Sequence, residues 1–327
     1  MTSDEIGAVV IGRNEGERLI RCLQSIGPYG IRTVYVDSGS TDGSAEAADR
    51  LGVLVVRLDF KQPFTAARAR NEGFAALIAG YPKIRFVQFI DGDCELDREW
   101  LNKALIFIGR RNDVAIVCGR RRERYPTASI YNQLFDFEWD TPIGEASACG
   151  GDSLVRVEAF RAVGGFRAQL IAGEEPELCV RMREKAWKIW RFDAEMTWHD
   201  AAMKRFGQWW KRAVRTGYAL AEVSRLHKHS SFGIWKREKR SAIFWGGAVP
   251  LAIAILMLAN ADAAVGILIY PLQICRLAFR KGITAPNSWT YALFMVLAQF
   301  PEFQGILKFN WHNLIGSPGD LIEYKRD

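Results

Sequence analysis

The stretch Phe89-Ile90-Asp91-Gly92-Asp93-Cys94-Glu95-Leu96 decides how this chain is interpreted. The apolar run 84–90 ends there in two carboxylates separated by one glycine. A buried parallel strand that breaks into a turn places Asp91 and Asp93 at the carboxyl edge of a sheet, where open α/β folds bind ligands. Oxygen ligands suit Mg²⁺ or Mn²⁺. Asp-Gly-Asp is also ordinary turn chemistry, so the rest of the chain has to distinguish a metal site from a turn.

Strand-like and helix-like runs alternate along the first third of the chain. Continuous apolar runs predict buried strands at 8–11, 31–36, 53–58 and 84–90, and helical spacing predicts helices at 15–25, 40–51 and 64–79. This alternation predicts a mostly parallel sheet with right-handed crossovers, flanked by helices, in a Rossmann-like α/β fold. Further on, we expect strands at 114–118 and 188–192 and helices at 98–108, 174–185 and 203–225.

The formal charge of +7 is concentrated in one segment. Between Lys204 and Arg240 the chain carries eleven Lys or Arg residues and two Glu, together with Trp209, Trp210 and Trp235. Anionic lipids attract basic residues next to a membrane, and tryptophan prefers the membrane interface. We therefore expect basic amphipathic juxtamembrane helices over 203–240. A solvated basic helix and a nucleic-acid patch are the alternatives, and we expect no nucleic acid as a partner.

Two uncharged apolar runs, 242–258 and 263–275, follow this basic segment. A helix needs about 20 apolar residues to cross ~30 Å of hydrocarbon, so we expect a hydrophobic hairpin over 241–281 that is transmembrane or re-entrant. Basic residues flank both of its ends, which places them in the cytoplasm. A shorter run, 289–300, predicts that segment 282–327 lies in the interface or packs back on the hairpin. Helices of a second soluble domain are the alternative.

The six cysteines lack metal-ligand spacing and are typical of reduced, buried thiols in a cytosolic domain. Residues 1–5 are polar and lead straight into a strand, so we expect no cleavable signal peptide.

Several motifs, taken in order, resemble those of the family 2 glycosyltransferases with the GT-A fold. They are Ala-Val-Val-Ile-Gly-Arg-Asn-Glu at 8–15, Val-Asp-Ser-Gly-Ser-Thr-Asp-Gly-Ser at 36–44, Ala-Arg-Asn-Glu-Gly at 69–73, Phe-Ile-Asp-Gly-Asp at 89–93 and Gly-Glu-Glu-Pro-Glu-Leu at 173–178. The resemblance covers roughly residues 6–220. It implies a catalytic GT-A domain over 1–202, with a nucleotide-sugar half at about 1–119 and an acceptor half at about 120–202.

The resemblance implies a donor site in the first half of this domain. Its residues are Val10, Arg13, Glu15, Asp37, Ser40, Arg68, Arg70, Asp91 and Gly92. Asp37 would accept hydrogen bonds from the donor's base or ribose, although a capping turn is the plainer reading. Arg70 resembles the family's basic contact to the nucleotide, and Arg68 remains an alternative on charge alone.

A divalent cation, Mg²⁺ or Mn²⁺, is also implied. Asp93 is the expected ligand, Asp91 lies near the ribose and the cation, and His199 resembles a histidine that completes the cation's shell in some relatives. A metal that bridges two phosphates stabilises the departing nucleoside diphosphate. A structural role is the alternative for His199.

Glu175 takes the position of the family's general base. An inverting transfer needs one carboxylate within hydrogen-bond reach of the acceptor hydroxyl. Because glutamate replaces the usual aspartate here, the adjacent Glu174 stays open as the base, and an acidic first helical turn is the plain alternative.

The acceptor side is assigned to Gly151, Asp152 and Trp139. Gly150-Gly151-Asp152 stands where relatives often have glycine followed by asparagine, and Trp139 offers a stacking surface for a sugar or a packing residue. The basic run 120–124 is a candidate contact for an acceptor's diphosphate. Residues 208–212 match only loosely the Gln-x-x-Arg-Trp element of processive synthases, which argues against a polymerase.

We therefore expect an inverting, metal-dependent glycosyltransferase at the bacterial inner membrane, with its catalytic domain facing the cytoplasm. The expected partners are a nucleotide-sugar donor, UDP-sugar favoured, a lipid-linked or glycan acceptor, and membrane lipids. A polyprenyl-phosphate hexosyltransferase and a non-catalytic nucleotide-sugar-binding scaffold are the alternatives. A nucleotidyltransferase is disfavoured because no Lys-containing, glycine-rich phosphate loop follows the first strand.

Overall fold

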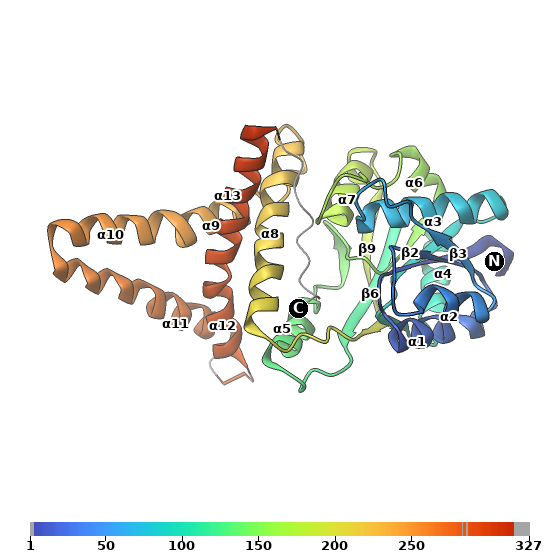
Figure 1. Ribbon diagram of the computed structural model, residues 1–327, viewed down its shortest axis with the longest axis horizontal. Coiled ribbons are helices and arrows are strands. Elements are labelled where there is room, and N and C mark those ends of the chain that lie inside the picture. Colours follow the sequence, from blue (N-terminus) through green and yellow to red (C-terminus); the bar gives the residue numbers. More distant parts are fainter. Residues whose placement is uncertain (1–2, 283, 286, 317–327) are drawn as a thin grey trace. The chain divides into compact units, whose positions relative to one another are not determined.

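The computed structural model describes residues 3–282, 284–285 and 287–316, which form two compact units (Figure 1). Unit 1 comprises Met1–Lys204 and unit 2 comprises Arg205–Asp327. The sheet, with all of its strands, belongs to unit 1, whereas unit 2 is helical over its described residues.

A nine-stranded mixed sheet forms the centre of unit 1, with the order β3-β2-β1-β4-β8-β6-β9-β5 and β7 paired to β9. The strands are β1 (Ile6–Gly12), β2 (Arg32–Asp37), β3 (Leu54–Arg57), β4 (Phe86–Asp91), β5 (Cys94–Leu96), β6 (Val114–Glu123), β7 (Gly144–Ala146), β8 (Ser153–Arg156) and β9 (Lys188–His199). Strands β1 to β4 are mutually parallel, as the alternation of strands and helices predicts.

The carboxyl edge of these parallel strands carries the first polar groups of interest. Strand β1 lies between β2 and β4, so that Gly12 pairs with Asp37 and Ile11 pairs with Asp91. The two aspartates therefore flank the end of β1. This is the edge at which ligands bind in open α/β sheets.

Helices cover both faces of the sheet. They are α1 (Glu17–Ile26), α2 (Ser44–Arg50), α3 (Ala66–Gly80), α4 (Trp100–Arg110), α5 (Ile130–Glu138), α6 (Val157–Ala162) and α7 (Glu174–Glu184), with short 3₁₀ turns at Ser3–Glu5 and Gly27–Tyr29. One core cluster joins α3, α6 and α7 to the sheet, and a second joins α1 and α4 to its other face. Because successive strand residues alternate between two buried faces, the strands are apolar throughout.

Strands β6 and β9 extend well beyond the predicted runs 114–118 and 188–192, and the short strands β5, β7 and β8 were not predicted. Strand β6 continues to Glu123, β9 continues to His199, and β5 follows directly after the Asp91-Gly92-Asp93 turn. Their outer halves mix buried and half-buried polar residues, so they lack the apolar run that marks a strand in sequence. In the register, His199 lies opposite both Cys94 and Glu123.

Unit 2 contains a pair of closely packed helices, α8 (Phe206–Leu226) and α13 (Gln299–Ile315). The two helices cross at two glycines, Gly217 and Gly305. A Cβ atom on Gly217 would lie 1.9 Å from the carbonyl oxygen of Glu302, and one on Gly305 would lie 2.0 Å from that of Val214. The apolar face of α8, predicted as a juxtamembrane helix, is thus covered at least in part by α13.

A long helical hairpin extends from this pair. It consists of α9 (Lys236–Ile243), a π-helical turn (Phe244–Ala248), α10 (Val249–Ala259), a 3₁₀ segment (Ala261–Leu268) and α11 (Ile269–Lys281). Lys236–Ala259 and Ala261–Lys281 are each long and apolar enough to cross a membrane, with 11% and 6% of their most apolar windows buried. Helix α12 (Ser288–Leu297) packs against α11, which is one of the two arrangements expected for run 289–300. Part of the predicted segment 282–327, including 317–327, lies outside the described residues.

Candidate active site

A buried arginine joins the end of β4 to the start of α7. Arg70, on α3, places Nη2 2.8 Å from Oδ1 of Asp91 and Nη1 2.9 Å from Oε1 of both Glu174 and Glu175. Burial alone would lower the pKa of Arg70, but the carboxylates of Glu175, Asp91 and Glu174 raise it above its ordinary value. The guanidinium therefore stays charged and holds three predicted site carboxylates together.

The two candidate bases differ in their surroundings. The side chain of Glu174 is 6% exposed and that of Glu175 is 15% exposed. Burial, followed by repulsion from Glu174, raises the pKa of Glu175 to about 7, although Arg70 acts in the opposite direction. A carboxylate with a pKa near neutrality that solvent can reach is suited to accept a proton. The geometry favours Glu175 over Glu174.

Gly151 has no side chain, and the ion pair of Arg70 and Asp91 occupies the space where a Cβ atom would lie. A Cβ atom at this position would lie 2.4 Å from Nη2 of Arg70 and 3.0 Å from Oδ2 of Asp91. Only hydrogen fits there without displacing the ion pair. The neighbouring Gly150 has no heavy atom within 4 Å of the corresponding position. Gly151, predicted on the acceptor side, therefore lies directly against the Arg70–Asp91 pair.

Asp152 is a buried connector at the start of β8. Its Oδ1 accepts a hydrogen bond of 3.0 Å from the backbone N–H of Asp91, and its Oδ2 accepts one of 2.8 Å from the Thr197 hydroxyl. Arg121 adds an ion pair of 3.4 Å to Oδ2. Both carboxylate oxygens of Asp152 thus hold neighbouring strands together. This placement makes Asp152 a supporting group of the site.

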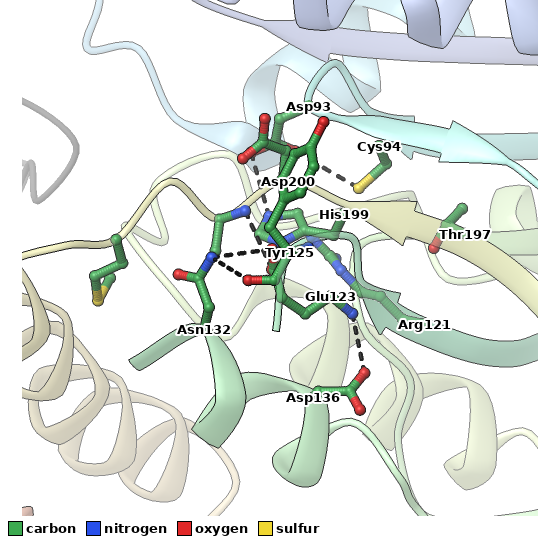
Figure 2. Close-up of polar contacts among 12 residues, drawn as sticks. Asp93, Cys94, Arg121, Glu123, Tyr125, Asn132, Asp136, Thr197, His199 and Asp200 are labelled. Carbon is green, nitrogen blue, oxygen red and sulfur yellow. Dashed lines mark hydrogen bonds and ion pairs between the residues drawn. The ribbon is translucent and has the colours of Figure 1, made fainter. Parts of the chain in front are cut away.

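Asp93, His199 and Glu123 form a chain of polar contacts (Figure 2). The Nε2 atom of His199 lies 3.3 Å from Oδ2 of Asp93, and its Nδ1 atom lies 3.3 Å from Oε2 of Glu123. The Glu123 side chain is fully buried. It also accepts hydrogen bonds from Asn132 Nδ2 and from the backbone N–H groups of Tyr125 and Ala201. Glu123 therefore fixes the imidazole ring in place.

This arrangement fits a divalent cation. A carboxylate on one ring nitrogen of a histidine fixes the tautomer and leaves the other nitrogen as a ligand. Here that second nitrogen faces Asp93. The Cys94 sulfur also lies close to both groups, but burial raises the pKa of this thiol well above its ordinary value, and Mg²⁺ and Mn²⁺ prefer oxygen to sulfur. Asp93 and His199 are thus the residues best suited to hold the metal.

Trp139 packs against this candidate metal site. Its ring meets the His199 ring edge-on at 4.8 Å, and the Arg121 guanidinium lies 4.8 Å from the indole centroid. Arg121 also contacts Asp91 at 3.5 Å. The half-buried Trp139 therefore packs beside the carboxylate edge, and its acceptor-side role stays a prediction.

Other predicted donor residues are engaged in local structure. One oxygen of Asp37 accepts from the backbone N–H groups of Gly39 and Ser40, and the other accepts from the Tyr35 hydroxyl. These bonds form a turn at residues 37–40, ahead of α2, whose N-cap residue is Gly43. The Ser40 hydroxyl accepts from the backbone N–H of Asn14. Both side chains thus brace the loop at the carboxyl edge.

Arg68 and Arg70 have separate surroundings. Nη1 of Arg68 donates to the backbone carbonyls of Asp59 and Gln62, each at 3.0 Å, and so ties down the segment before α3. Of the two, only Arg70 contacts the carboxylates of Asp91, Glu174 and Glu175 among the described residues. This distinction supports Arg70 as the site residue.

The remaining predicted donor residues lie around the end of β1. Val10 is fully buried within the strand, and its side chain packs in the core. Arg13 lies over the Phe64 ring at 5.4 Å, and Glu15 pairs with Arg18 at 2.7 Å. The Gly92 N–H donates to the carbonyl of Ile11 at 2.8 Å, which docks the Asp-Gly-Asp turn on β1.

Sequence analysis did not identify Glu123 or Arg121 as individual site residues. Both lie on the outer half of β6, in a run that the sequence shows only as basic. Their roles arise from the pairing of β6 with β9, which joins residues far apart in the chain. No local pattern signals that pairing.

Comparison with known proteins relates this chain to glycosyltransferases. Residues 8–164 match the model of glycosyl transferase family 2. The chain is 26% identical over 247 residues to the succinoglycan biosynthesis protein ExoA of Rhizobium meliloti (strain 1021), which covers 70% of this chain and 74% of that protein. Fold and site together define a glycosyltransferase with the GT-A fold. Residues 8–164, which carry most of these side chains, match glycosyl transferase family 2.

Solved structures share the fold at low sequence identity. A mannosyltransferase from Pyrobaculum calidifontis, in complex with GDP-Man and Mn²⁺, aligns with a TM-score of 0.65 and 18% identity over 94% of this chain and 87% of that chain. TarS 1-349 of S. aureus aligns with a TM-score of 0.51 and 12% identity over 96% of this chain and 92% of that chain. Glucosyl-3-phosphoglycerate synthase from Mycobacterium tuberculosis, in complex with Mn²⁺ and UDP-glucose, aligns with a TM-score of 0.50 and 16% identity over 67% of this chain and 78% of that chain.

Proposed function

We propose that this glycosyltransferase moves a sugar from a nucleotide-diphosphate sugar to an acceptor hydroxyl with inversion at the anomeric carbon. One observation carries the proposal: Arg70 bridges Asp91, at the end of β4, to Glu175, at the start of α7. The bridge holds a candidate base beside the carboxylate edge where a donor would bind. Such fixed geometry reduces the entropic cost of bringing donor and acceptor together.

Glu175 is the proposed base. As the acceptor oxygen attacks the anomeric carbon, its proton passes to a Glu175 oxygen, and the bond from that carbon to the donor's phosphate oxygen breaks on the opposite face. A pKa of about 7 lets Glu175 take the proton near neutrality and release it to water afterwards. Arg70 orients the carboxylate and stays protonated.

Asp93 and His199 would hold a divalent cation, Mg²⁺ or Mn²⁺, with Asp91 nearby. The contact between His199 and Glu123 supports this role, and the fold neighbours from P. calidifontis and M. tuberculosis contain Mn²⁺. When bound, the cation supplies positive charge for the departing diphosphate. Those neighbours bind GDP-Man and UDP-glucose, respectively, which supports a nucleotide sugar as donor and leaves its base and sugar open.

The acceptor we propose is a lipid-linked glycan, reached at the cytoplasmic face of a bacterial inner membrane. Support comes from the two apolar spans of the hairpin, whose described side chains are largely exposed, and from the relative that takes part in succinoglycan biosynthesis. Exposed apolar helices of this length are stable in lipid. Basic residues at both ends of the hairpin favour the cytoplasmic side for those ends.

A donor screen with the detergent-solubilised full chain tests this function. GDP-mannose, UDP-glucose and UDP-N-acetylglucosamine are each incubated with a membrane lipid extract, with Mn²⁺ or with chelator, and released nucleoside diphosphate is measured. We expect metal-dependent release from one donor that requires the extract. Release by the Glu175→Gln variant at the same rate as the unmodified protein would remove the proposed base.

A further inference from the structure

Unit 2 contains a cavity of about 530 Å³ at the base of the hairpin. Its lining residues come from α9, the π-helical turn, α11, α12 and the start of α13. Figure 1 shows the two arms of the hairpin separating from their shared tip toward α12 and α13. The volume falls within the range of about 300–1,000 Å³ that is typical of small-molecule sites.

Four arginines line this cavity. Arg237 and Arg240 lie three residues apart on α9, and Arg276 and Arg280 lie four apart on α11, so that each pair occupies one face of its helix. No Asp or Glu lines the cavity. Among the residues that the structure describes, none of the four guanidinium groups forms an ion pair, and Arg276 donates to Gln273 at 3.4 Å. Like charges gathered without carboxylates favour an anion between them.

The cavity also has an apolar wall. Phe244, Trp245 and Leu277 line it together with the arginines. From there the exposed apolar side chains of the hairpin continue outward, among them Leu251 and Leu272. A ligand that suits both surfaces has an anionic head and an apolar chain. A soluble anion uses only the first of them.

The position of the arginines along the hairpin agrees with such a ligand. Arg237 and Arg240 lie near the beginning of the span Lys236–Ala259, and Arg276 and Arg280 lie near the end of the span Ala261–Lys281. If the hairpin enters a bilayer from its tip, all four lie at the same membrane surface, where lipid phosphates are located. Basic pockets between membrane helices on this side bind phosphate-bearing head groups.

We propose that this cavity binds the phosphate or diphosphate head group of a membrane lipid, with the lipid chain lying along the hairpin. The inference goes beyond glycosyl transfer, because it depends only on unit 2. Two lipids have the required chemistry: a bulk anionic phospholipid and a polyprenyl diphosphate. The second would make the cavity an acceptor-binding site and in that case rests on the proposed function.

The test measures lipid binding directly. The full chain is placed in phosphatidylcholine nanodiscs that contain a trace of phosphatidylglycerol or of undecaprenyl diphosphate, and bound lipid is counted by native mass spectrometry. The variants are Arg240→Gln, Arg276→Gln and the double variant. The matched control is Arg225→Gln, which removes one exposed positive charge of the same unit outside the cavity.

We expect each cavity substitution to weaken binding of at least one lipid by about fivefold and the pair by about 25-fold, as for about 1 kcal/mol per basic residue. Arg225→Gln should leave binding within about twofold of the unmodified protein, since no direct contact is lost. If the cavity variants lose binding of undecaprenyl diphosphate alone, the cavity is an acceptor-binding site. If they lose binding of both lipids, the cavity binds membrane phosphates in general.

Equal losses in Arg225→Gln and the cavity variants would overturn the proposal, because general surface charge would then explain binding. Binding of inorganic diphosphate with no binding of either lipid would overturn the lipid assignment. Because no sugar is transferred in this assay, its result is independent of whether the proposed reaction occurs. A circular dichroism spectrum of each variant confirms that its helices are intact.

Discussion

The Nη1 atom of Arg70 lies 2.9 Å from Oε1 of Glu175. The same guanidinium contacts Asp91 at the end of β4. A rigid, planar cation between carboxylates fixes their mutual positions. The distance between the proposed base and the donor edge is therefore set by the protein before any substrate binds, which is what an efficient transfer requires.

Replacing Glu175 by Gln should lower kcat by about 10²-fold or more, because the acceptor's proton then has no base. Glu174→Gln keeps that base and should have the smaller effect, although it also loses a contact to Arg70. Steady-state release of nucleoside diphosphate measures both variants. The opposite ranking would move the base to Glu174.

The raised pKa of Glu175 predicts the pH dependence of the rate. A base must be deprotonated to act, so kcat/KM should rise with pH and level off above about pH 7, where Glu175 is ionised. Measuring kcat/KM from pH 5 to pH 9 tests this rise. A flat profile over that range would argue against Glu175 as the titrating group.

The same group also affects stability. The pKa of Glu175 is about 7 in the folded protein against an ordinary value of 4.5, so the folded state holds the extra proton between these pH values. Stability therefore falls as pH rises through this window, by at most about 3 kcal/mol. Glu175→Gln cannot ionise, and its Tm should decline less between pH 5 and pH 8. Thermal unfolding at several pH values compares the two proteins.

Asp93→Ala should abolish most metal-dependent turnover. Losing the charge stabilisation that a bound cation supplies costs several kcal/mol, which corresponds to about 10²-fold or more in rate. The exposed Asp193 offers a matched control, since Asp193→Asn removes a carboxylate on the same unit away from His199. Unchanged turnover in a folded Asp93→Ala protein would refute the metal role.

Glu123→Gln should weaken Mn²⁺ binding by about 10–100-fold, because the carboxylate orients His199, and in Gln an amide NH2 group replaces the Oε2 oxygen that faces Nδ1. Electron paramagnetic resonance of free Mn²⁺ measures the affinity without turnover. Gln retains one oxygen for the bonds from Asn132 and Tyr125, so we expect a folded protein. Unaltered affinity would make Glu123 a purely structural residue.

Gly151→Ala should destabilise the site by about 1–3 kcal/mol, because the new Cβ meets Arg70 at 2.4 Å and the ion pair must move. Gly150→Ala is the control, since the same atom there has no neighbour within 4 Å. Both changes reduce the entropy of the unfolded chain alike. The difference in their Tm and kcat/KM therefore reports the contact with Arg70. Equal values would show that Arg70 moves at no cost.

The sequence by itself determined the parallel half of the sheet and the carboxylates at its edge. Apolar runs predicted β1 to β4 because strands buried on both faces need apolar side chains throughout. The residues that end these strands, Asp37 and Asp91, then had to share one edge. The resemblance to family 2 glycosyltransferases rested on ordered motifs, and the family model, over residues 8–164, covers the four that lie between 8 and 93.

Only the tertiary structure decided which polar groups meet at that edge. Strands β6 and β9 extend into mixed, half-buried sequence, and their pairing brings Glu123 to His199 across 76 residues of chain. The tertiary structure likewise distinguishes Arg68 from Arg70. The two lie two residues apart, but Arg68 donates to a backbone carbonyl and Arg70 pairs with Asp91. Neighbours in sequence constrain the backbone locally, whereas a site's hydrogen bonds and pKa values depend on groups that the fold brings in from elsewhere. For that reason the Asp91-Gly92-Asp93 turn could be predicted from the sequence, whereas the series of contacts from Asp93 through His199 to Glu123 could not.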